Sequence, residues 1–532
     1  MIYFIKHIIL IFILVLFFIS ESFSQHRNIR INDVNLTSDG KREANEPSIW
    51  INPKNPNEIM AGSNLHFWYF SKDSGNTWET NILRSSYGVW GDPCIITNAS
   101  GEFIFSHLSS PDTSVHSDGS WIDRIVTQTF LKESSTFTDG TFLQKNETKA
   151  QDKQWMALCP KTDNVYMSWT EFDKYGSSDK DKHSRILFAK STNGGDSWSS
   201  SKTISTFEGD CMDSDFTTEG AMPVITPDGT VIVVWSFDDK LWIQRSEDQG
   251  ETWLSEEREI HNQIGGWEYS IPGLGRSNGF PIVKADYFSP DGNGTIYLNW
   301  SDQAFGFNDT DIWFSKSTDK GETWSKKTKV NDDDSGNHQF LTWMDVDQST
   351  GYIYFVFYDR REYLDNQTDV YMAISKDKGE TFQNFKISES TFTPSEKKFL
   401  GDYNNLSVRD NIIRPVWTRQ DSGVQYIMTA LVEPDKIISS VESPFATFKA
   451  YPNPFYDNLF LEYNNSKHQV IDLDIVNIQG IFVKNIFSGK YLKPKNYQFN
   501  LISYFSDLTP GIYFLKLKSK SGVETFKILY KD

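Results

Sequence analysis

The sequence predicts an all-β chain made of a seven-unit β-propeller followed by a small β-sandwich. Three observations predict this fold. One octapeptide occurs five times, each copy lies between strand-like runs that group in fours, and the last part of the chain changes to short strands separated by Gly and Pro turns. A length of 532 residues, 15% of them aromatic, suits a large β-rich core and more than one domain.

The first 24 residues have the composition of a secretory signal peptide. Lys6 and His7 precede an apolar run from Ile8 to Ile19, and small residues flank Phe23, so cleavage is expected before Gln25. An uncleaved membrane anchor is the alternative, but the apolar run is short for a bilayer. We expect no transmembrane segment after removal of the signal peptide.

The recurring octapeptide has the form Ser-x-Asp-x-Gly-x-Thr-Trp and is best seen at Ser317 to Trp324. The carboxylate of Asp319 can accept hydrogen bonds from its own turn, Gly321 can adopt a positive φ, and Trp324 can pack on the sheet. We therefore expect a hairpin turn in each copy. The residues with this structural role are Asp73, Asn193, Asp248, Asp319 and Asp377.

Four short strands per copy make one blade of a propeller. The clearest unit contains Val231 to Trp235 and Leu241 to Arg245 before its octapeptide. Two further units without a good octapeptide bring the number to seven within residues 25–432. The last unit has three strands, and Asn28 to Asp33 is expected to supply its fourth, which closes the ring and removes exposed sheet edges.

Residues 433–448 are expected to form a linker, and residues 449–532 a separate β-sandwich. The second segment begins with Tyr451 to Pro454 and ends with Leu508 to Leu517, where alternating strands follow a Pro-Gly turn.

The octapeptide resembles the Asp box, or BNR repeat, of the sialidase-like families, and the resemblance covers roughly residues 27–432. It implies a β-propeller in which these turns are structural, with six blades as the alternative to seven. The C-terminal segment, with Tyr-Pro-Asn-Pro at its start and Gly-Ile-Tyr near its end, resembles the type IX secretion sorting domain of Bacteroidota. That resemblance implies the type IX secretion machinery as a partner, and a secreted or surface-attached protein; an adhesive or sugar-binding sandwich is the alternative.

Charge and cysteine content limit the possible partners. A formal net charge of −19 argues against nucleic acid or an anionic membrane as a partner. Three cysteines, without metal-ligand spacing, are too few for a disulfide framework. We expect no cofactor and no metal.

Strand alternation places the long polar loops on the face opposite the octapeptide turns, and we expect a binding site there. The residues that begin each innermost strand should surround the axis on that face. They either form a functional rim or cap the strand starts. These residues are Glu46, Asp92, Asp152, Glu219, Asn278, His338 and Asp402.

Three arginines of this face could hold a carboxylate or sulfate through a bidentate fork: Arg276, Arg360 and Arg361. Salt bridges to rim acids are the alternative. Trp267 and Tyr269, in the longest loop, could stack on a sugar ring, or could pack the loop onto the blades.

The resemblance to sialidases implies further roles. It makes Asp92 the acid, Glu219 the base, Arg276 and Arg360 the clamps, and Tyr403 the nucleophile. Where sialidases have Arg-Ile-Pro ahead of the first box, this chain has Asn-Glu-Pro at residues 45–47, so the first clamp arginine is missing.

Three hypotheses follow. The first is a secreted, sialidase-like glycoside hydrolase on an acidic or sulfated sugar. The second is a polysaccharide lyase on a uronate-containing glycan, with His338 or Tyr403 as base. The third is a non-catalytic propeller that binds glycan or protein.

Overall fold

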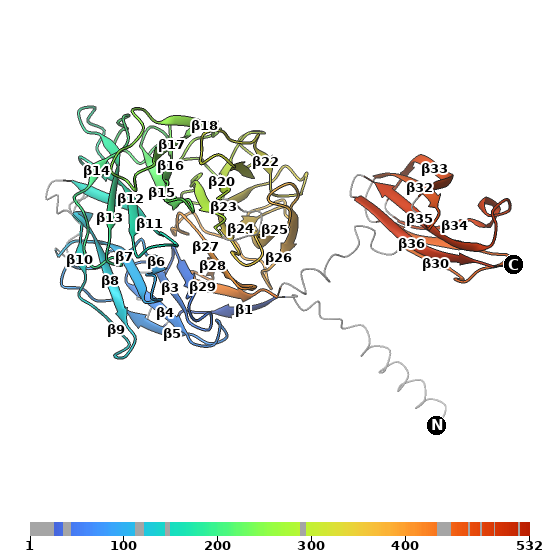
Figure 1. Cartoon of the computed structure of the whole chain (residues 1–532), viewed down its shortest axis with the longest axis horizontal. Coiled ribbons are helices and arrows are strands. Elements are labelled where there is room, and N and C mark those ends of the chain that lie inside the picture. Colours follow the sequence, from blue (N-terminus) through green and yellow to red (C-terminus); the bar gives the residue numbers. More distant parts are fainter. Residues whose placement is uncertain are drawn as a thin grey trace, which may run out of the picture. The chain divides into compact units, whose positions relative to one another are not determined.

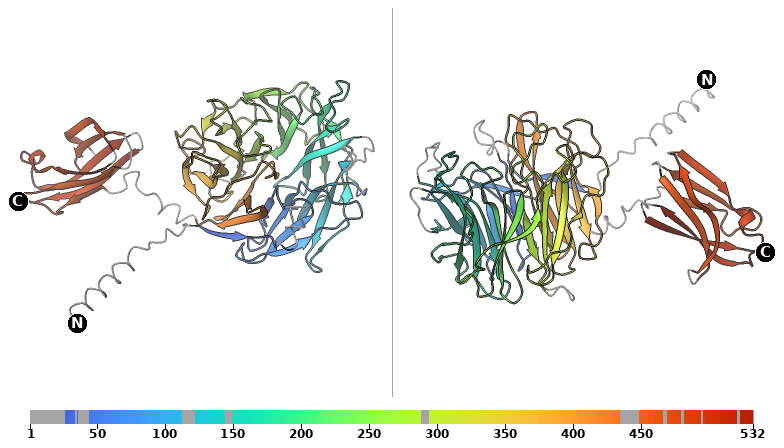
Figure 2. Two further views of the ribbon diagram at one scale, coloured as in Figure 1. Left: turned by 180° about the vertical axis from the view of Figure 1, so that it is seen from behind. Right: turned by 90° about the horizontal axis from the view of Figure 1, so that it is seen from above.

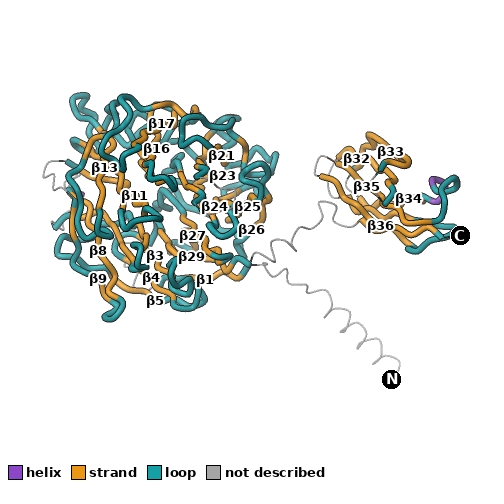
Figure 3. Tube along the Cα trace, viewed as in Figure 1, coloured by secondary structure: helices purple, strands orange, loops and turns teal. Residues whose placement is uncertain are grey.

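The computed structural model describes residues 26–33, 35, 44–111, 122–143, 149–287, 294–433, 448–465, 469–478, 481–493, 495–519 and 522–531. The chain divides into two compact units, Met1–Glu433 and Pro434–Asp532. The predicted signal peptide and most of the predicted linker lie outside the described residues. Strands and loops make up nearly all of both units (Figure 3).

The described part of the first unit contains seven antiparallel sheets, whose first strands lie toward the centre and whose last strands lie at the rim (Figure 1). Six of them keep chain order. Their strands are β2 (Ser48–Ile51), β3 (Ile59–Ser63), β4 (Phe67–Ser71) and β5 (Glu79–Ile82); β6 (Cys94–Thr97), β7 (Phe103–Ser109), β8 (Arg124–Leu131) and β10 (Thr141–Phe142), with β9 (Thr136–Phe137) also paired to β8; β11 (Ala150–Leu158), β12 (Val165–Phe172), β13 (Ser184–Ser191) and β14 (Lys202–Thr203); β15 (Glu219–Ile225), β16 (Val231–Phe237), β17 (Lys240–Ser246) and β18 (Arg258–Asn262); β19 (Ile282–Ala285), β20 (Ile296–Asp302), β21 (Asp311–Ser317) and β22 (Thr328–Lys329); and β23 (Gln339–Val346), β24 (Ile353–Asp359), β25 (Asp369–Ser375) and β26 (Gln383–Lys386).

The remaining sheet joins the two ends of this unit. It contains β27 (Asn405–Arg409), β28 (Ile412–Asp421), β29 (Val424–Leu431) and β1 (Arg27–Arg30), and β1 pairs antiparallel with β29 so that Ile29 lies opposite Thr429. The expectation that the N-terminal segment completes the last sheet is confirmed. The first strands β2, β6, β11, β15, β19, β23 and β27 each contact the next, and β27 contacts β2, so the ring is closed. The predicted all-β propeller is confirmed, and Figure 2 shows its sheets from two further directions.

The octapeptide turns share one hydrogen-bond pattern. In the copy at 317–324, the Ser317 hydroxyl donates to Asp319 Oδ1 (2.8 Å) and accepts the Gly321 N–H (2.8 Å), while Thr323 donates its N–H (2.9 Å) and its hydroxyl (2.5 Å) to the Asp319 carboxylate. Gly321 has φ +81°, and a Cβ there would lie 2.6 Å from Ile243 Cδ1 of the preceding blade. The glycine is therefore required both by its conformation and by close packing.

These turns lie on the face of the turns that follow each first strand. Ser74 of one octapeptide donates its N–H to the Asn57 carbonyl (3.0 Å) in the turn between β2 and β3. The other face carries the loops that enter the first strands, as the alternation of strands predicts.

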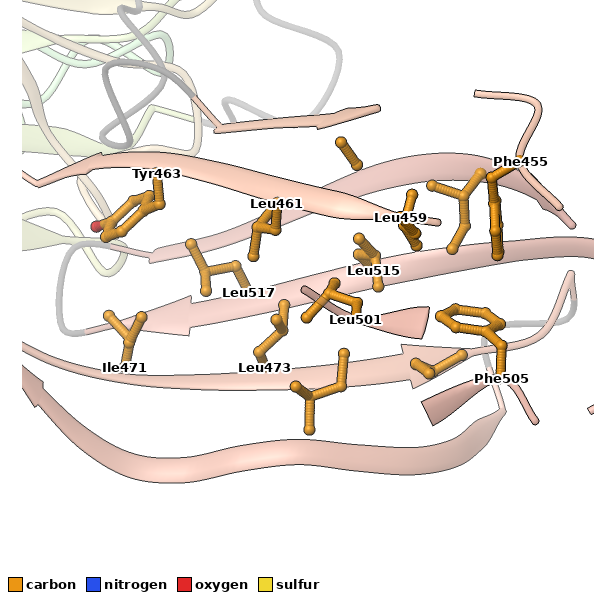
Figure 4. Close-up of a cluster of buried hydrophobic side chains, with 14 of the residues drawn as sticks. Phe455, Leu459, Leu461, Tyr463, Ile471, Leu473, Leu501, Phe505, Leu515 and Leu517 are labelled. Atoms are coloured by element: carbon orange, nitrogen blue, oxygen red, sulfur yellow. The ribbon is translucent and has the colours of Figure 1, made fainter. Parts of the chain in front are cut away.

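The second unit is a β-sandwich. One sheet contains β30 (Phe448–Tyr451), β31 (Phe460–Asn465) and β34 (Lys495–Asn500), and the other contains β33 (Phe482–Leu492), β32 (Gln469–Val476), β35 (Gly511–Ser519) and β36 (Gly522–Tyr530). A short 3-10 helix, Ile502–Tyr504, follows β34. Leu461, Leu473, Leu515 and Leu517 are buried between the two sheets (Figure 4). This unit has an apolar core of its own.

The octapeptide carboxylate can be tested by stability. We predict that Asp319→Ala lowers the free energy of unfolding of the propeller by about 1–3 kcal/mol, because three donors lose their acceptor. Asp319→Asn should cost less, since Asn193 accepts the same bonds from Ser191 (2.8 Å) and from the Ser197 N–H (3.0 Å). All 17 Trp lie before residue 433, so Trp fluorescence in denaturant reports on the propeller within the full chain. Equal stability of the Ala and Asn variants would contradict this role.

Candidate functional site

Left-handed residues mark the points where first strands begin at the axis. Glu46, Asp92 and Lys153 have φ of 50°, 50° and 53°, and pairing shifts between Asp152 and Trp155. A bulge of this kind redirects the side chain that follows it. The loop-rich end of the channel therefore receives charged groups from several blades.

Lys153 is the centre of this charged cluster. Its Nζ lies 3.1 Å from Asp92 Oδ2, 3.0 Å from Asp402 Oδ2, 3.8 Å from Asp152 Oδ1 and 3.9 Å from Glu46 Oε1. The lysine side chain is 7% exposed. One ammonium group thus links carboxyls that precede or begin four different first strands.

Arg276 extends the cluster toward solvent. Its guanidinium contacts Asp213 Oδ2 (2.6 Å) and Asp402 Oδ2 (2.6 Å), and stands over the Phe399 ring at 5.8 Å. The Arg276 side chain is 28% exposed, against 1% for Asp402. Asp213 also accepts bonds from Tyr175 (3.1 Å) and from Trp267 Nε1 (3.3 Å). Arg276 is therefore the most accessible of these grouped charges, but two carboxylates already neutralise it.

The carboxyls of the cluster differ in their pKa values. Burial, together with the charge of Asp92, raises the pKa of Asp152 to about 8 although Lys153 opposes the shift. Burial and the neighbouring acids also raise the pKa of Glu46 and of Glu219. For Asp402, burial alone would raise the pKa, but Arg276 and Lys153 outweigh it and the pKa is lowered. At neutral pH a protonated Asp152 therefore lies in the same cluster as an ionised Asp402.

Two of the carboxyls with a raised pKa form hydrogen bonds inside the cluster. Asp152 and Glu46 are each hydrogen-bonded through their side chains to Asp92. Glu46 also accepts the Asp402 N–H (3.1 Å) and a bond from the Asn64 side chain. Glu219 is fully buried, and its Oε1 has no partner among the described residues.

Tyr403 belongs to an aromatic layer beneath the charges. Its ring centroid lies 5.2 Å from that of Trp155 and 6.2 Å from those of Phe280 and Trp343, and Trp155 and Trp343 are 4.7 Å apart. Burial, followed by the charges of Asp92 and Glu46, raises the pKa of Tyr403 well above its ordinary value. Among the described residues, no hydrogen bond joins the Tyr403 hydroxyl to Glu219, the base in the sialidase-like assignment.

Arg360 is buried without a carboxylate partner among the described residues. It donates to Thr368 Oγ1 (3.0 Å) and to the Pro272 carbonyl (2.6 Å) and lies over the Phe340 ring, while its Nη2 makes no hydrogen bond to the described chain. Burial lowers its pKa to about 10. Pro272 and Arg276 are four residues apart, so the Cα atoms of the residue that Arg360 contacts and of Arg276 lie within about 14 Å of each other.

The other predicted residues lie elsewhere or pack inside. Arg361 pairs with Asp359 (2.7 Å) and Asp332 (2.6 Å), away from the cluster contacts. The His338 imidazole bonds Thr310 Oγ1 (2.9 Å), and burial, with Arg360 nearby, lowers its pKa to about 4. Trp267 is 1% exposed and packs on Phe280, so it supports the loop instead of offering a face to solvent.

Two members of the cluster were missed from the sequence. Lys153 follows Asp152 directly, and the bulge places Lys153 at the position that Glu46 and Asp92 hold in their units. Asp213 comes from the loop before β15 and not from a strand start. Asn278 supports the cluster by donating from its side chain to the Asp402 carbonyl (3.0 Å).

The described residues contain no group of three or more His, Cys, Asp or Glu side chains arranged to hold a metal ion. Among the same residues, no helix has the length and apolar character needed to cross a bilayer.

Comparison with known protein families identifies the C-terminal unit. Residues 449–531 match the secretion system C-terminal sorting domain. The chain therefore has a type IX export signal, and is secreted or attached to the cell surface. No curated protein matches the chain.

Solved structures resemble the chain at low identity. A protein of unknown function from Dyadobacter fermentans has 13% identity and a TM-score of 0.43 over 66% of this chain and 96% of its own. A Hadza microbial sialidase has 14% identity and a TM-score of 0.40, and the match covers 71% of this chain and 74% of the sialidase. An α-L-arabinofuranosidase from Fusarium graminearum, solved with an iminosugar inhibitor, has 11% identity and a TM-score of 0.43. The match covers 78% of this chain and 99% of the arabinofuranosidase. At these identities the similarity does not define a substrate.

The shifted carboxyl gives a stability prediction. An unfolded Asp has a pKa of about 3.9, so the folded Asp152, with a pKa of about 8, contributes stability that is present below pH 4 and lost as the pH rises toward 8. Asp152→Asn stays neutral and has no such loss. The free energy of unfolding of the wild type, minus that of the variant, should therefore fall between pH 4 and 8, by at most about 1.4 kcal/mol per pH unit. Denaturant titrations followed by Trp fluorescence measure it, and a difference independent of pH would contradict it.

Proposed function

We propose that the propeller is a glycoside hydrolase that acts outside the cell on an acidic or sulfated glycan. The observation that carries this proposal is the pair Asp92 and Asp152, hydrogen-bonded to each other beside Lys153, with Asp152 protonated at neutral pH. A carboxyl that is protonated at neutral pH can act as the general acid of glycosidic bond hydrolysis.

In this proposal Asp152 is the general acid. Its proton goes to the glycosidic oxygen as the bond from that oxygen to the anomeric carbon breaks. A water molecule then adds to the anomeric carbon and returns a proton to the Asp152 carboxylate, while Asp92 holds that carboxyl in place through the hydrogen bond between them. Lys153 holds both carboxyls in position, at 3.8 Å and 3.1 Å from its Nζ.

The assignment differs from the roles implied by the sialidase resemblance. Tyr403 has a raised pKa and lacks a carboxylate base at Glu219, so it is a poor nucleophile at neutral pH. In this proposal Asp152 takes the place of the acid, and Asp92 positions Asp152 through the hydrogen bond between them. Substrate would reach the pair from the side of Arg276, the most exposed group of the cluster.

Arg360 supports an anionic substrate. Among the described residues, Arg276 has two carboxylate partners and Arg361 has three, whereas Arg360 has none and keeps one nitrogen unpaired. A buried, uncompensated guanidinium is costly and is stabilised by an anion. A sugar carboxylate or sulfate, brought in when the loop containing Pro272 moves, would supply that charge.

The polysaccharide lyase has less support. Its candidate bases are Tyr403 and His338. The raised pKa of Tyr403 keeps the phenol protonated at neutral pH, and the pKa of His338, lowered to about 4, makes its neutral imidazole a weak base. Product analysis decides between them, because a lyase leaves an unsaturated sugar that absorbs in the near ultraviolet.

We predict hydrolysis of at least one acidic or sulfated glycan in a panel that begins with a fluorogenic sialic acid substrate and includes uronates and neutral sugars. Asp152→Asn should lower kcat by about 10²–10⁴, and wild-type activity should fall as the pH rises above about 8, where Asp152 loses its proton. The exposed Asp334→Asn variant is the control. Glycan binding without turnover by the wild type would leave only the non-catalytic propeller.

We predict that Arg360→Lys raises KM for the acidic substrate at least tenfold and leaves kcat nearly unchanged, because Lys keeps the charge without the planar fork. Arg361→Lys should leave KM unchanged and lower Tm, since Arg361 joins a structural ion network. A rise in KM with Arg361→Lys alone would reverse the assignment of the anion-binding arginine.

A further inference from the structure

A cavity occupies the opposite end of the propeller channel. It has a volume of about 370 Å³ and is lined by residues of all seven first strands. Its mouth lies on the face of the octapeptide turns, where the exposed residues Lys54 and Ala99 line it. The volume is within the range of about 300–1,000 Å³ that small-molecule sites occupy.

The aromatic layer separates this cavity from the charged cluster. Trp155 and Trp343 line the cavity, whereas the cluster residues Asp92, Lys153 and Asp402 do not. Tyr403 and Phe280 pack against the two Trp rings on the other side. A ligand in the cavity would therefore not touch the proposed catalytic pair.

The charge of the cavity is opposite to that of the chain. Its lining contains three cationic residues, Lys54, Lys284 and Arg409, and one acidic residue, Asp345, in a chain of formal net charge −19. Neither Lys54 nor Arg409 has an ion pair with a described residue. A concentrated positive potential in an acidic protein favours an anionic ligand.

Lys284 is the best placed of these cations. Its Nζ makes no hydrogen bond to the described residues and lies 3.8 Å from Asp345 Oδ1 and 6.0 Å from the ring centroids of Trp50 and Trp343. Asp345 already accepts the Val408 N–H at 2.8 Å. The ammonium group therefore retains donors for a ligand between two indole rings.

We infer that this cavity is a second binding site, for a monosaccharide-sized acidic sugar. The indole rings offer apolar faces on which the C–H face of a sugar ring can pack. Lys284 and Arg409 offer donors for its carboxylate, and Asp345 offers an acceptor for a hydroxyl. The inference is independent of the proposed hydrolase activity, because it rests on other residues at the other end of the channel.

The test uses the full chain and titrates sodium D-glucuronate, D-glucose and benzoate, followed by calorimetry and Trp fluorescence. Glucuronate should bind at least tenfold more tightly than either of the other two. Lys284→Met and Trp50→Leu should each weaken it at least tenfold. Lys397→Met, an exposed lysine away from the cavity, and Asp152→Asn should bind as the wild type does.

Three outcomes would overturn the inference. The first is that glucuronate fails to bind the folded wild type. The second is that Lys284→Met and Trp50→Leu, with Tm near that of the wild type, bind glucuronate as tightly as the wild type does. The third is that benzoate binds as tightly as glucuronate. Failure of the proposed function is distinguishable from failure of this site: unchanged hydrolysis by Asp152→Asn, or no hydrolysis by the wild type, would contradict the proposed function, whereas glucuronate binding by the same proteins would still support the site.

Discussion

One buried ammonium group organises the centre of the propeller. Lys153 stands among carboxyls from Glu46, Asp92, Asp152 and Asp402, which belong to four different blades. Removing one partner of a buried charge group costs about 3–5 kcal/mol, whereas the intact group contributes little net stability. The arrangement therefore fixes the relative positions of four first strands, and it forces some carboxyls to keep their protons. The proposed chemistry depends on that imbalance of charge.

The aromatic layer explains how one channel has two different ends. Trp155, Phe280, Trp343 and Tyr403 fill the axis with rings in mutual contact. A layer of this kind removes water from the floor of the acidic cluster, which strengthens the electrostatic interactions above it. It also leaves the other end free to carry the opposite charge.

The architecture was largely predictable because it rests on local chemistry that repeats. The Ser, Asp, Gly and Thr positions of the octapeptide form the same bonds in the copies that begin at Ser71, Ser246, Ser317 and Ser375, and the pairing of residues 27–30 with β29 follows from a missing strand. The proximity of Asp92, Asp152 and Asp402 to one another follows from their places at strand starts, whereas Arg276 reaches Asp402 from a loop. The tertiary partners of single residues were not. The difference between Arg360 and Arg361 depends on which carboxylates fold beside each, and Lys153 was hidden by a bulge that shifts the register by one residue.

The pairing of β1 with β29 also affects how the ring assembles. Near this pairing, Ile427 donates its N–H to Asn32, which is 395 positions away in the chain. Bringing such distant segments together carries a large loop-closure entropy, and folds dominated by distant contacts form slowly. Until the first strand docks, β29 presents an open edge that can pair with another chain. Since Arg27 lies two residues beyond the expected cleavage point, trimming a few residues further would leave that edge exposed in an otherwise complete ring.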